Sequence, residues 1–177
     1  MNVLLMGLRG SGKTTAGRLL AARLALVFVD LDDVTAAELG AVSVAEAWRR
    51  AGEPDFRRAE AEALTKVLAR DGQVVALGGG TPMVPGVPDL LASCAGSERS
   101  VLLYLAAPAD VLRERLRVMD NSNRPSLTGA GVLDEIEAVL SRRDPIYREL
   151  AEVVIETSGQ TPEETVEKVV RLVEMRS

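Results

Sequence analysis

The sequence predicts an α/β protein in which short apolar strands alternate with helices, and three observations lead to this fold class. The apolar run 3–6 leads directly into a glycine-rich stretch that opens a helical segment. Further short apolar runs, separated by segments of helical periodicity, follow at 27–29, 74–77, 101–105 and 153–155. The 177 residues are 47% hydrophobic, and no long linker or change of composition divides them. We therefore expect one domain over residues 1–177.

The glycine-rich stretch meets the pattern G-x-x-x-x-G-K-[ST] at every defined position, as Gly7-Leu8-Arg9-Gly10-Ser11-Gly12-Lys13-Thr14-Thr15. Its backbone N–H groups and the positive end of the following helix suit a polyphosphate. Lys13 adds a positive charge for the β- and γ-phosphates, and the Thr14 hydroxyl can bind Mg²⁺. A turn whose glycines serve only backbone geometry is disfavoured, because the full pattern and its context are both present. The stretch indicates a nucleoside triphosphate site and leaves the acceptor open.

Charge and composition exclude several classes of protein. The formal net charge of -5 argues against general nucleic-acid binding. No apolar run reaches membrane-spanning length and the N-terminus lacks a secretion-signal pattern, so we expect a cytoplasmic protein without a membrane partner. The lone cysteine, Cys94, excludes an internal disulfide framework and is interpreted as a small buried apolar residue rather than a nucleophile. The chain has no histidine to act as base or metal ligand.

Acidic residues follow the second apolar run. The helix before it, expected over 14–24, should face the sheet with Ala16, Leu19, Leu20 and Leu24. The run 27–29 then delivers Asp30 and Asp32 to the edge where strands end and ligands gather. Strand alternation would place both on one side, Asp30 toward Mg²⁺ through water and Asp32 toward an acceptor hydroxyl. The alternative is that Asp32 or Asp33 caps the next helix.

Two helices in tandem interrupt the alternation of strand and helix, and such an insertion can build an acceptor pocket. Ser43-Val44-Ala45-Glu46 is a capping-box pattern, and Pro54 suits the first residue of a second helix to about Ala69. Arg57 and Glu60 are spaced as i,i+3 neighbours, which from spacing alone favours a solvated ion pair. The same reasoning favours a core position for Trp48.

The third apolar run ends in Gly78-Gly79-Gly80, and three glycines there favour close approach of the backbone to a ligand. Farther on, Pro108 should start a helix to Met119. The polar segment 120–130 is either a surface loop or a lid, and Arg124 makes it a lid only if it reaches phosphate.

The C-terminal part should hold two more helices around the fifth strand. The first begins near Leu133, and Pro145 should end or kink it. The second is capped by Thr161-Pro162-Glu163-Glu164. Its valines should face inward at Val166, Val169, Val170 and Val173.

Taken together, the motifs resemble those of shikimate kinases over essentially the whole length. They are Asp30-Leu31-Asp32, Phe56-Arg57-Arg58, Gly78-Gly79-Gly80, Arg124-Pro125 and Arg143-x-Pro-x-Tyr147, all after the phosphate loop. The resemblance implies a three-layer P-loop kinase fold with a five-stranded parallel sheet in the order 2-3-1-4-5, a helical insertion over about 32–69 and a lid. It also implies transfer of phosphate from ATP to shikimate, with Mg²⁺ as cofactor, in a monomeric enzyme.

The resemblance assigns roles to particular residues. Those for ATP are Gly10, Ser11, Gly12, Lys13, Thr14, Thr15, Arg117, Arg124 and Gln160. Those for shikimate are Asp32, Trp48, Phe56, Arg57, Gly79, Gly80 and Arg143. Those for the metal are Thr14 and Asp30. Lys13, Asp32 and Arg124 would be catalytic. The shikimate-binding roles of Arg57 and Trp48 replace the interpretations that spacing alone favours, a solvated ion pair and a core position.

Two rival functions stay open at this point. One is another small-metabolite kinase of the same fold, for gluconate or a nucleoside monophosphate; arginines suited to a carboxylate speak against it. The other is a nucleotide-binding regulatory protein that has lost catalysis, which the intact Lys13, Thr14, Asp30, Asp32 and Arg124 speak against. Without histidine, Asp32 is the candidate to orient or deprotonate the attacking hydroxyl.

Overall fold

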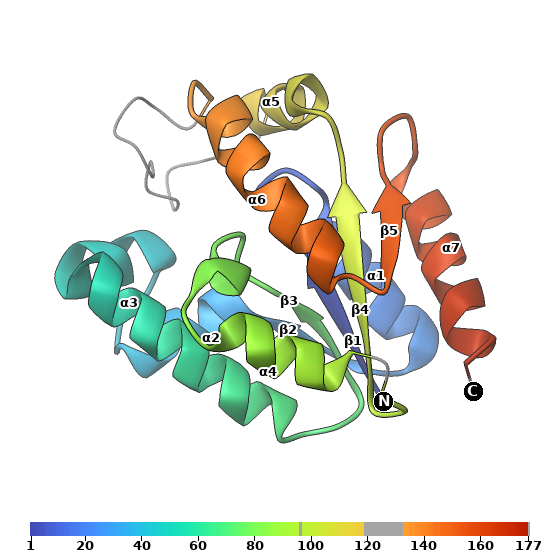
Figure 1. The fold of residues 1–177 in the computed structure, drawn as a ribbon, viewed down its shortest axis with the longest axis horizontal. Helices are drawn as coiled ribbons and strands as arrows, with labels where there is room; N and C mark the ends of the chain where they lie inside the picture. Colours follow the sequence, from blue (N-terminus) through green and yellow to red (C-terminus); the bar gives the residue numbers. More distant parts are fainter. Residues whose placement is uncertain (96, 119–132, 177) are drawn as a thin grey trace.

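The computed structural model describes residues 1–95, 97–118 and 133–176, and a five-stranded parallel sheet forms its centre (Figure 1). The strand order is β2-β3-β1-β4-β5. The strands are β1 (Asn2–Met6), β2 (Val27–Asp30), β3 (Gln73–Ala76), β4 (Ser100–Ala106) and β5 (Val153–Glu156). Every apolar run that the sequence predicts as a strand is one, and the sheet order expected from the resemblance is confirmed.

Helices cover both faces of the sheet, which makes three layers (Figure 1). They are α1 (Lys13–Leu24), α2 (Leu31–Glu38), α3 (Val44–Leu68), α4 (Val87–Cys94), α5 (Ala109–Arg117), α6 (Ile136–Leu150) and α7 (Pro162–Glu174). Along β1, Val3 and Leu5 pack with α1 and α7, whereas Leu4 and Met6 pack with α3, α4 and α6. The central strands are therefore buried on both sides, which explains their continuous apolar runs.

Helix α1 packs closely against the sheet through small residues. Its buried positions are Ala16, Gly17, Leu20 and Ala21. A side-chain carbon at Gly17 would lie 2.6 Å from the Phe28 ring, so a larger residue there would force this packing to shift. The prediction that Leu19 faces the sheet is wrong, because Leu19 falls outside this arc of the helix and is 38% exposed.

The insertion between β2 and β3 consists of α2 and α3. Ser43 caps α3 by accepting a hydrogen bond from the Glu46 backbone at 3.2 Å. The chain of α3 is broken at Gly52, whose φ of 75° and ψ of 166° are not helical, two residues before Pro54. The two tandem helices predicted from the sequence are thus confirmed as two arms of α3.

Helix α6 continues through Pro145 to Leu150, so of the two predicted effects of Pro145, an end or a kink, the end is ruled out. The missing N–H of proline costs one helical hydrogen bond. Two residues after Pro145, Tyr147 is fully buried in the core on the face of the sheet that α3 covers. This packing holds the last turns of α6 in place.

The other predictions for the C-terminal part hold where the structure describes them. Thr161 and Glu164 form the expected capping box of α7, and its four inward valines are buried. The segment 120–130 and Arg124 lie outside the described residues. Among the residues that are described, no helix is long and apolar enough to cross a membrane.

Candidate active site

Two cavities lie where strands of the sheet end, and both use residues of the glycine-rich loop. The first, here called the arginine cavity, is lined by Arg9, Lys13, Thr14, Asp30, Asp32, Val44, Trp48, Phe56, Arg57, Ala76, Leu77, Gly79, Gly80 and Arg143. The second, here called the threonine cavity, is lined by Gly10, Ser11, Gly12, Lys13, Thr14, Thr15, Ala16, Arg115, Val118, Thr157, Gln160, Pro162 and Thr165. Lys13 and Thr14 line both, so the two cavities meet at the start of α1.

The glycine-rich loop curls tightly between β1 and α1. Gly12 caps α1 with a φ of 94°, a left-handed conformation that residues with a side chain rarely adopt. The ammonium group of Lys13 donates hydrogen bonds to the carbonyls of Gly7 at 2.8 Å and Leu8 at 3.0 Å. The loop thus holds its own cation over the junction of the two cavities.

At the same junction, the Thr14 hydroxyl donates a hydrogen bond of 3.0 Å to the Asp30 carboxylate. Asp30 is also the cap of α2, because it accepts a bond of 3.2 Å from the Asp32 backbone N–H. The alternative that Asp32 or Asp33 caps this helix is therefore wrong. The strand ends at Asp30, so helix geometry rather than strand alternation brings Asp32 into the arginine cavity.

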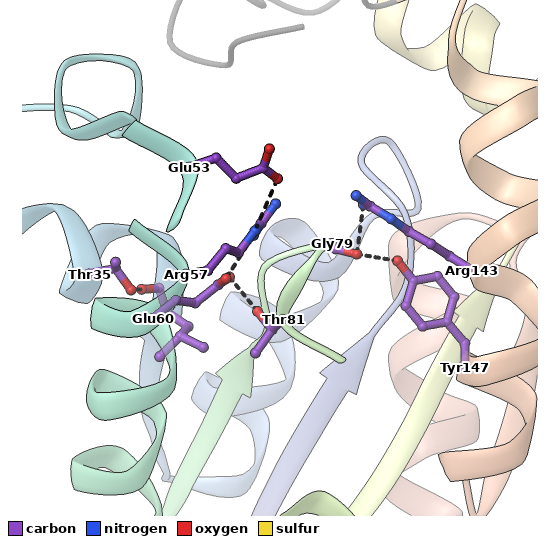
Figure 2. A network of polar contacts seen from close by, with 9 residues as sticks. Thr35, Glu53, Arg57, Glu60, Gly79, Thr81, Arg143 and Tyr147 are labelled. Carbon is purple, nitrogen blue, oxygen red and sulfur yellow. Dashed lines mark hydrogen bonds and ion pairs between the residues drawn. The ribbon is translucent and has the colours of Figure 1, made fainter. Parts of the chain in front are cut away.

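Arg57 comes from the second arm of α3 and is held by a buried carboxylate (Figure 2). Its guanidinium donates to Glu60 at 2.7 Å, and Glu60 is 0% exposed. The Thr81 hydroxyl donates to the other oxygen of Glu60 at 2.5 Å. The expectation of a solvated ion pair is wrong, because the Glu60 carboxylate is fully buried. A buried carboxylate needs hydrogen-bonding partners, and Arg57 and Thr81 are two such partners.

Aromatic rings form the wall beside Arg57. The guanidinium carbon lies 5.0 Å from the Trp48 ring centroid and 5.9 Å from that of Phe56. The two rings are in turn 5.2 Å apart in a tilted arrangement. Trp48 therefore lines the cavity instead of lying in the core, and the aromatic faces stabilise the arginine charge.

Arg143 reaches the opposite wall from α6 and contacts the glycine loop after β3 (Figure 2). Its guanidinium donates to the Gly79 carbonyl at 2.8 Å. The Tyr147 hydroxyl, one helical turn away, donates to the same carbonyl. Burial raises the pKa of Tyr147 to about 12, against the lowering effect of the nearby Arg143, so the phenol remains a donor at neutral pH.

A second tyrosine, Tyr104, connects β4 to α6. The Tyr104 hydroxyl donates to Asp144 at 2.7 Å, and Arg148 donates to the same carboxylate at 2.7 Å. Burial alone would raise the pKa of Asp144, but the hydrogen bonds from Arg148 and Tyr104 outweigh it and lower the pKa. Asp144 therefore stays charged and ties α6 to β4.

Arg115 organises the threonine cavity. It donates to the Thr157 hydroxyl at 3.0 Å and to the Thr157 carbonyl at 2.6 Å, and it reaches the Gly10 carbonyl at 3.4 Å. These bonds join the glycine-rich loop to the segment after β5. Gln160 also lines this cavity, whereas Arg117 is exposed, pairs with Glu114 at 3.2 Å and does not line it.

Comparisons with known proteins identify the family. A family model described as shikimate kinase matches residues 9–174. This chain belongs to the shikimate kinase family. It is 40% identical over 157 residues to a shikimate kinase of Halorhodospira halophila, covering 89% of this chain and 84% of the relative. It is 35% identical to that of Symbiobacterium thermophilum, over 99% and 98% of the two chains.

Solved structures agree with this assignment. Shikimate kinase from Acinetobacter baumannii in complex with shikimate matches with a TM-score of 0.87 at 30% identity, over 99% of this chain and 94% of that one. A shikimate kinase from Bacteroides thetaiotaomicron matches with a TM-score of 0.84 at 28% identity, over 98% of each chain. As a member of the shikimate kinase family, the protein is a kinase, and therefore a phosphotransferase.

The structure brings most of the predicted shikimate kinase residues together. All seven residues predicted for shikimate line the arginine cavity. The six loop residues predicted for ATP, together with Gln160, line the threonine cavity. Arg117 lies outside that lining, and Arg124 falls outside the described residues.

Two arginines near the site were missed by reasoning from the sequence. Arg9 occupies a variable position of the loop pattern, so the pattern itself gives it no role. Arg115 lies between the buried Leu112 and Leu116, and this helical phase distinguishes it from the exposed Arg117. That phase is visible in the sequence and could have identified Arg115.

Proposed function

We propose that the protein transfers the γ-phosphate of ATP to the 3-hydroxyl of shikimate, giving shikimate 3-phosphate and ADP on the route to chorismate. The observation that carries this proposal is the arginine cavity. It presents Arg57 and Arg143 from opposite walls, and Asp32 lines the same cavity together with Lys13 and Thr14 of the phosphate loop. A small acceptor with one carboxylate and several hydroxyls fits this arrangement of charges.

Arg57 and Arg143 bind the acceptor carboxylate. Both are planar cations that can donate two parallel hydrogen bonds to its oxygens, which a lysine cannot do. Glu60 fixes the orientation of Arg57, and the Gly79 carbonyl fixes that of Arg143. The backbone of Gly79 and Gly80 and the rings of Trp48 and Phe56 complete the acceptor site.

ATP binds in the threonine cavity with its phosphates on the loop. Backbone N–H groups of residues 10–15 and the positive end of α1 stabilise the phosphate charge. Lys13 exchanges its bonds to the Gly7 and Leu8 carbonyls for bonds to phosphate oxygens. Gln160 contacts the adenine side, and we keep Arg117 and Arg124 as proposed ATP contacts.

Mg²⁺ fits the residues at the junction of the cavities. The Thr14 hydroxyl and the Asp30 carboxylate are hard oxygen donors 3.0 Å apart, the ligand type that Mg²⁺ prefers. In the described part of the chain, no group of three or more His, Cys, Asp or Glu could hold a metal alone. Two protein oxygens completed by phosphate oxygens and water suit a metal that arrives with the nucleotide, and it supplies charge neutralisation there.

Asp32 aligns the attacking hydroxyl and accepts its proton. The acceptor oxygen then forms a bond to the γ-phosphorus as the bond from that phosphorus to the bridging oxygen of ADP breaks. The proton passes from Asp32 to solvent, so the reaction releases one proton with ADP. Lys13 and Arg124 stabilise the negative charge on the transferred group.

We also propose that the enzyme is a monomer in the cytoplasm.

Coupled ADP release tests the proposed function. Shikimate, quinate, gluconate and nucleoside monophosphates are compared at equal concentrations, with and without a chelator of Mg²⁺. Of the acceptors tested, we expect only shikimate to give fast ADP release. This release should be lost when the chelator is present. Preferred turnover of gluconate or a nucleoside monophosphate would overturn the substrate assignment, and ATP binding without any turnover would favour the regulatory function.

A further inference from the structure

Arg9 lies on the acceptor side of the phosphate loop. It lines the arginine cavity and does not line the threonine cavity. Its backbone nitrogen lies 3.7 Å from the point where a side chain on Gly79 would begin, so the phosphate loop and the glycine loop meet at Arg9. The residue therefore stands next to the place where a phosphate on the acceptor would come to lie.

The charge of Arg9 is largely removed from water. Its side chain is 14% exposed, and it pairs at 3.7 Å with Glu135, whose side chain is 2% exposed. This separation is an ion pair that is longer than a hydrogen bond. Glu135 directly precedes α6, the helix that carries Arg143. The pair thus keeps a cation beside the cavity and links the phosphate loop to the start of the helix that carries Arg143.

Among the described cations of the arginine cavity, Arg9 is the one to which the proposed function gives no role. The acceptor enters with one carboxylate, and the product leaves with an added phosphate of about two negative charges. Among the described residues, the cationic side chains of the arginine cavity are Arg9, Lys13, Arg57 and Arg143. The proposed function assigns Arg57 and Arg143 to the carboxylate and Lys13 to the nucleotide phosphates.

We propose that Arg9 contacts the transferred phosphoryl group from the acceptor side and binds the phosphate of the product. This inference rests on the proposed function. Arg9 then acts late in the reaction: it binds shikimate weakly, binds the phosphoryl group as it crosses from the nucleotide, and binds shikimate 3-phosphate strongly. Lys13 and Arg9 would contact the same group from its two sides.

Arg9→Met tests this role, because methionine keeps an unbranched apolar chain and removes the charge. Binding of shikimate, and of shikimate 3-phosphate in the presence of ADP, is followed through the fluorescence of Trp48, the chain's only tryptophan. We expect the affinity for shikimate 3-phosphate to fall by roughly 10-fold to 100-fold, that for shikimate to change by less than about threefold, and kcat to fall. Arg9→Lys should retain part of the product affinity.

The double variant Arg9→Met with Glu135→Gln separates phosphate binding from structural support. Arg9→Met alone leaves Glu135 buried without this cation, which can lower the melting temperature. The double variant removes both charges, so it should regain stability yet still bind shikimate 3-phosphate weakly. Recovery of the wild-type product affinity would show that Arg9 only supports α6.

Two further results would overturn the inference: equal weakening of shikimate and shikimate 3-phosphate, which indicates a contact to the carboxylate, or no weakening of either. Turnover of shikimate by the wild-type protein is measured in the same series of experiments. A failure of the proposed function would appear in that measurement, whereas a failure of the Arg9 assignment would leave it intact.

Discussion

Arg57 and Glu60 form an ion pair of 2.7 Å in which the carboxylate is fully buried and the guanidinium reaches the cavity. A buried charge is costly unless it is paired and hydrogen-bonded, and Glu60 meets both conditions through Arg57 and Thr81. The second arm of α3 therefore carries both the cation that is proposed to bind the acceptor and the carboxylate that orients it. The geometry of this wall thus depends on Glu60, which lines neither cavity.

Arg57→Ala should raise the KM for shikimate strongly and that for ATP little. Loss of a charged hydrogen-bonding partner of a desolvated carboxylate costs on the order of 2 to 4 kcal/mol. The adjacent Arg58→Ala is the matched control, because Arg58 is exposed and pairs with Asp55 outside both cavities. Steady-state kinetics with each substrate varied in turn measure the effect, and equal weakening of both substrates would contradict the carboxylate role.

Glu60→Gln should raise the KM for shikimate while leaving the ATP site nearly unchanged. A neutral amide would orient the Arg57 guanidinium less firmly than the carboxylate does. Glu53→Gln is its control: Glu53 also faces Arg57, but at 3.8 Å and with a side chain that is 61% exposed. Exposed pairs contribute little. Similar kinetic effects of the two variants would show that burial of Glu60 does not govern the orientation of Arg57.

Lys13→Ala should abolish turnover and leave the melting temperature close to that of the wild type. The ammonium group donates to the loop carbonyls of Gly7 and Leu8, and its position at the junction of the cavities suits the phosphates. Lys66→Ala, which removes an exposed lysine paired with Glu38, should retain full activity. Wild-type kcat in Lys13→Ala would end the assignment of the phosphate loop.

The fold was predictable because each strand of the sheet is marked by a run of apolar residues. Parallel strands covered on both faces have few polar positions, and the run 101–105 lies within β4, all of which is buried. Helix faces were harder to predict. Leu19 has the right chemistry for the core but lies on the outer arc of α1, whereas Gly17 and Ala21 lie on the buried arc and allow close packing against the sheet.

The site was only partly predictable, because its geometry depends on contacts distant in sequence. Asp30 and Asp32 were identified by position, yet their arrangement follows from Asp30 capping α2. Burial of Glu60 needs Thr81, which is 21 residues away. Spacing within one helix contains no information about such a partner, so it favoured a solvated pair.

The two tyrosines, Tyr104 and Tyr147, should not ionise in the folded protein until strongly alkaline pH. Burial raises the pKa of Tyr147 to about 12, and burial together with the bond to Asp144 also raises the pKa of Tyr104. An unfolded tyrosine ionises near pH 10. Because the folded pKa values are higher, their contribution to stability is full below about pH 10 and is lost as the pH rises further.

Ultraviolet absorbance of tyrosinate, followed together with far-ultraviolet circular dichroism, measures this. Tyrosinate should appear in step with unfolding, while protein unfolded in denaturant should titrate near pH 10 as the control. A tyrosinate signal near that pH in protein with native dichroism would contradict the buried donor role of Tyr147 at the Gly79 carbonyl.

Alanine at each position of the glycine triplet should give three different results, because the three glycines face different neighbours. None has a positive φ, so the cost of a side chain is steric. At Gly78 the new carbon would collide with the buried Glu60 and lie 2.5 Å from the Asp32 carboxylate. At Gly80 it would lie 2.5 Å from the Arg57 guanidinium, whereas at Gly79 its nearest neighbours are 3.5 Å away.

Gly78→Ala should therefore lower both the melting temperature and kcat, since a buried carboxylate and Asp32 must both shift. Gly80→Ala should leave the melting temperature nearly unchanged and raise the KM for shikimate, because the flexible end of Arg57 can move aside. Gly79→Ala should disturb stability least of the three. Thermal melts and kinetics on the three variants measure this order. A wild-type KM for shikimate in Gly80→Ala would show that Arg57 need not hold its present position to bind the acceptor.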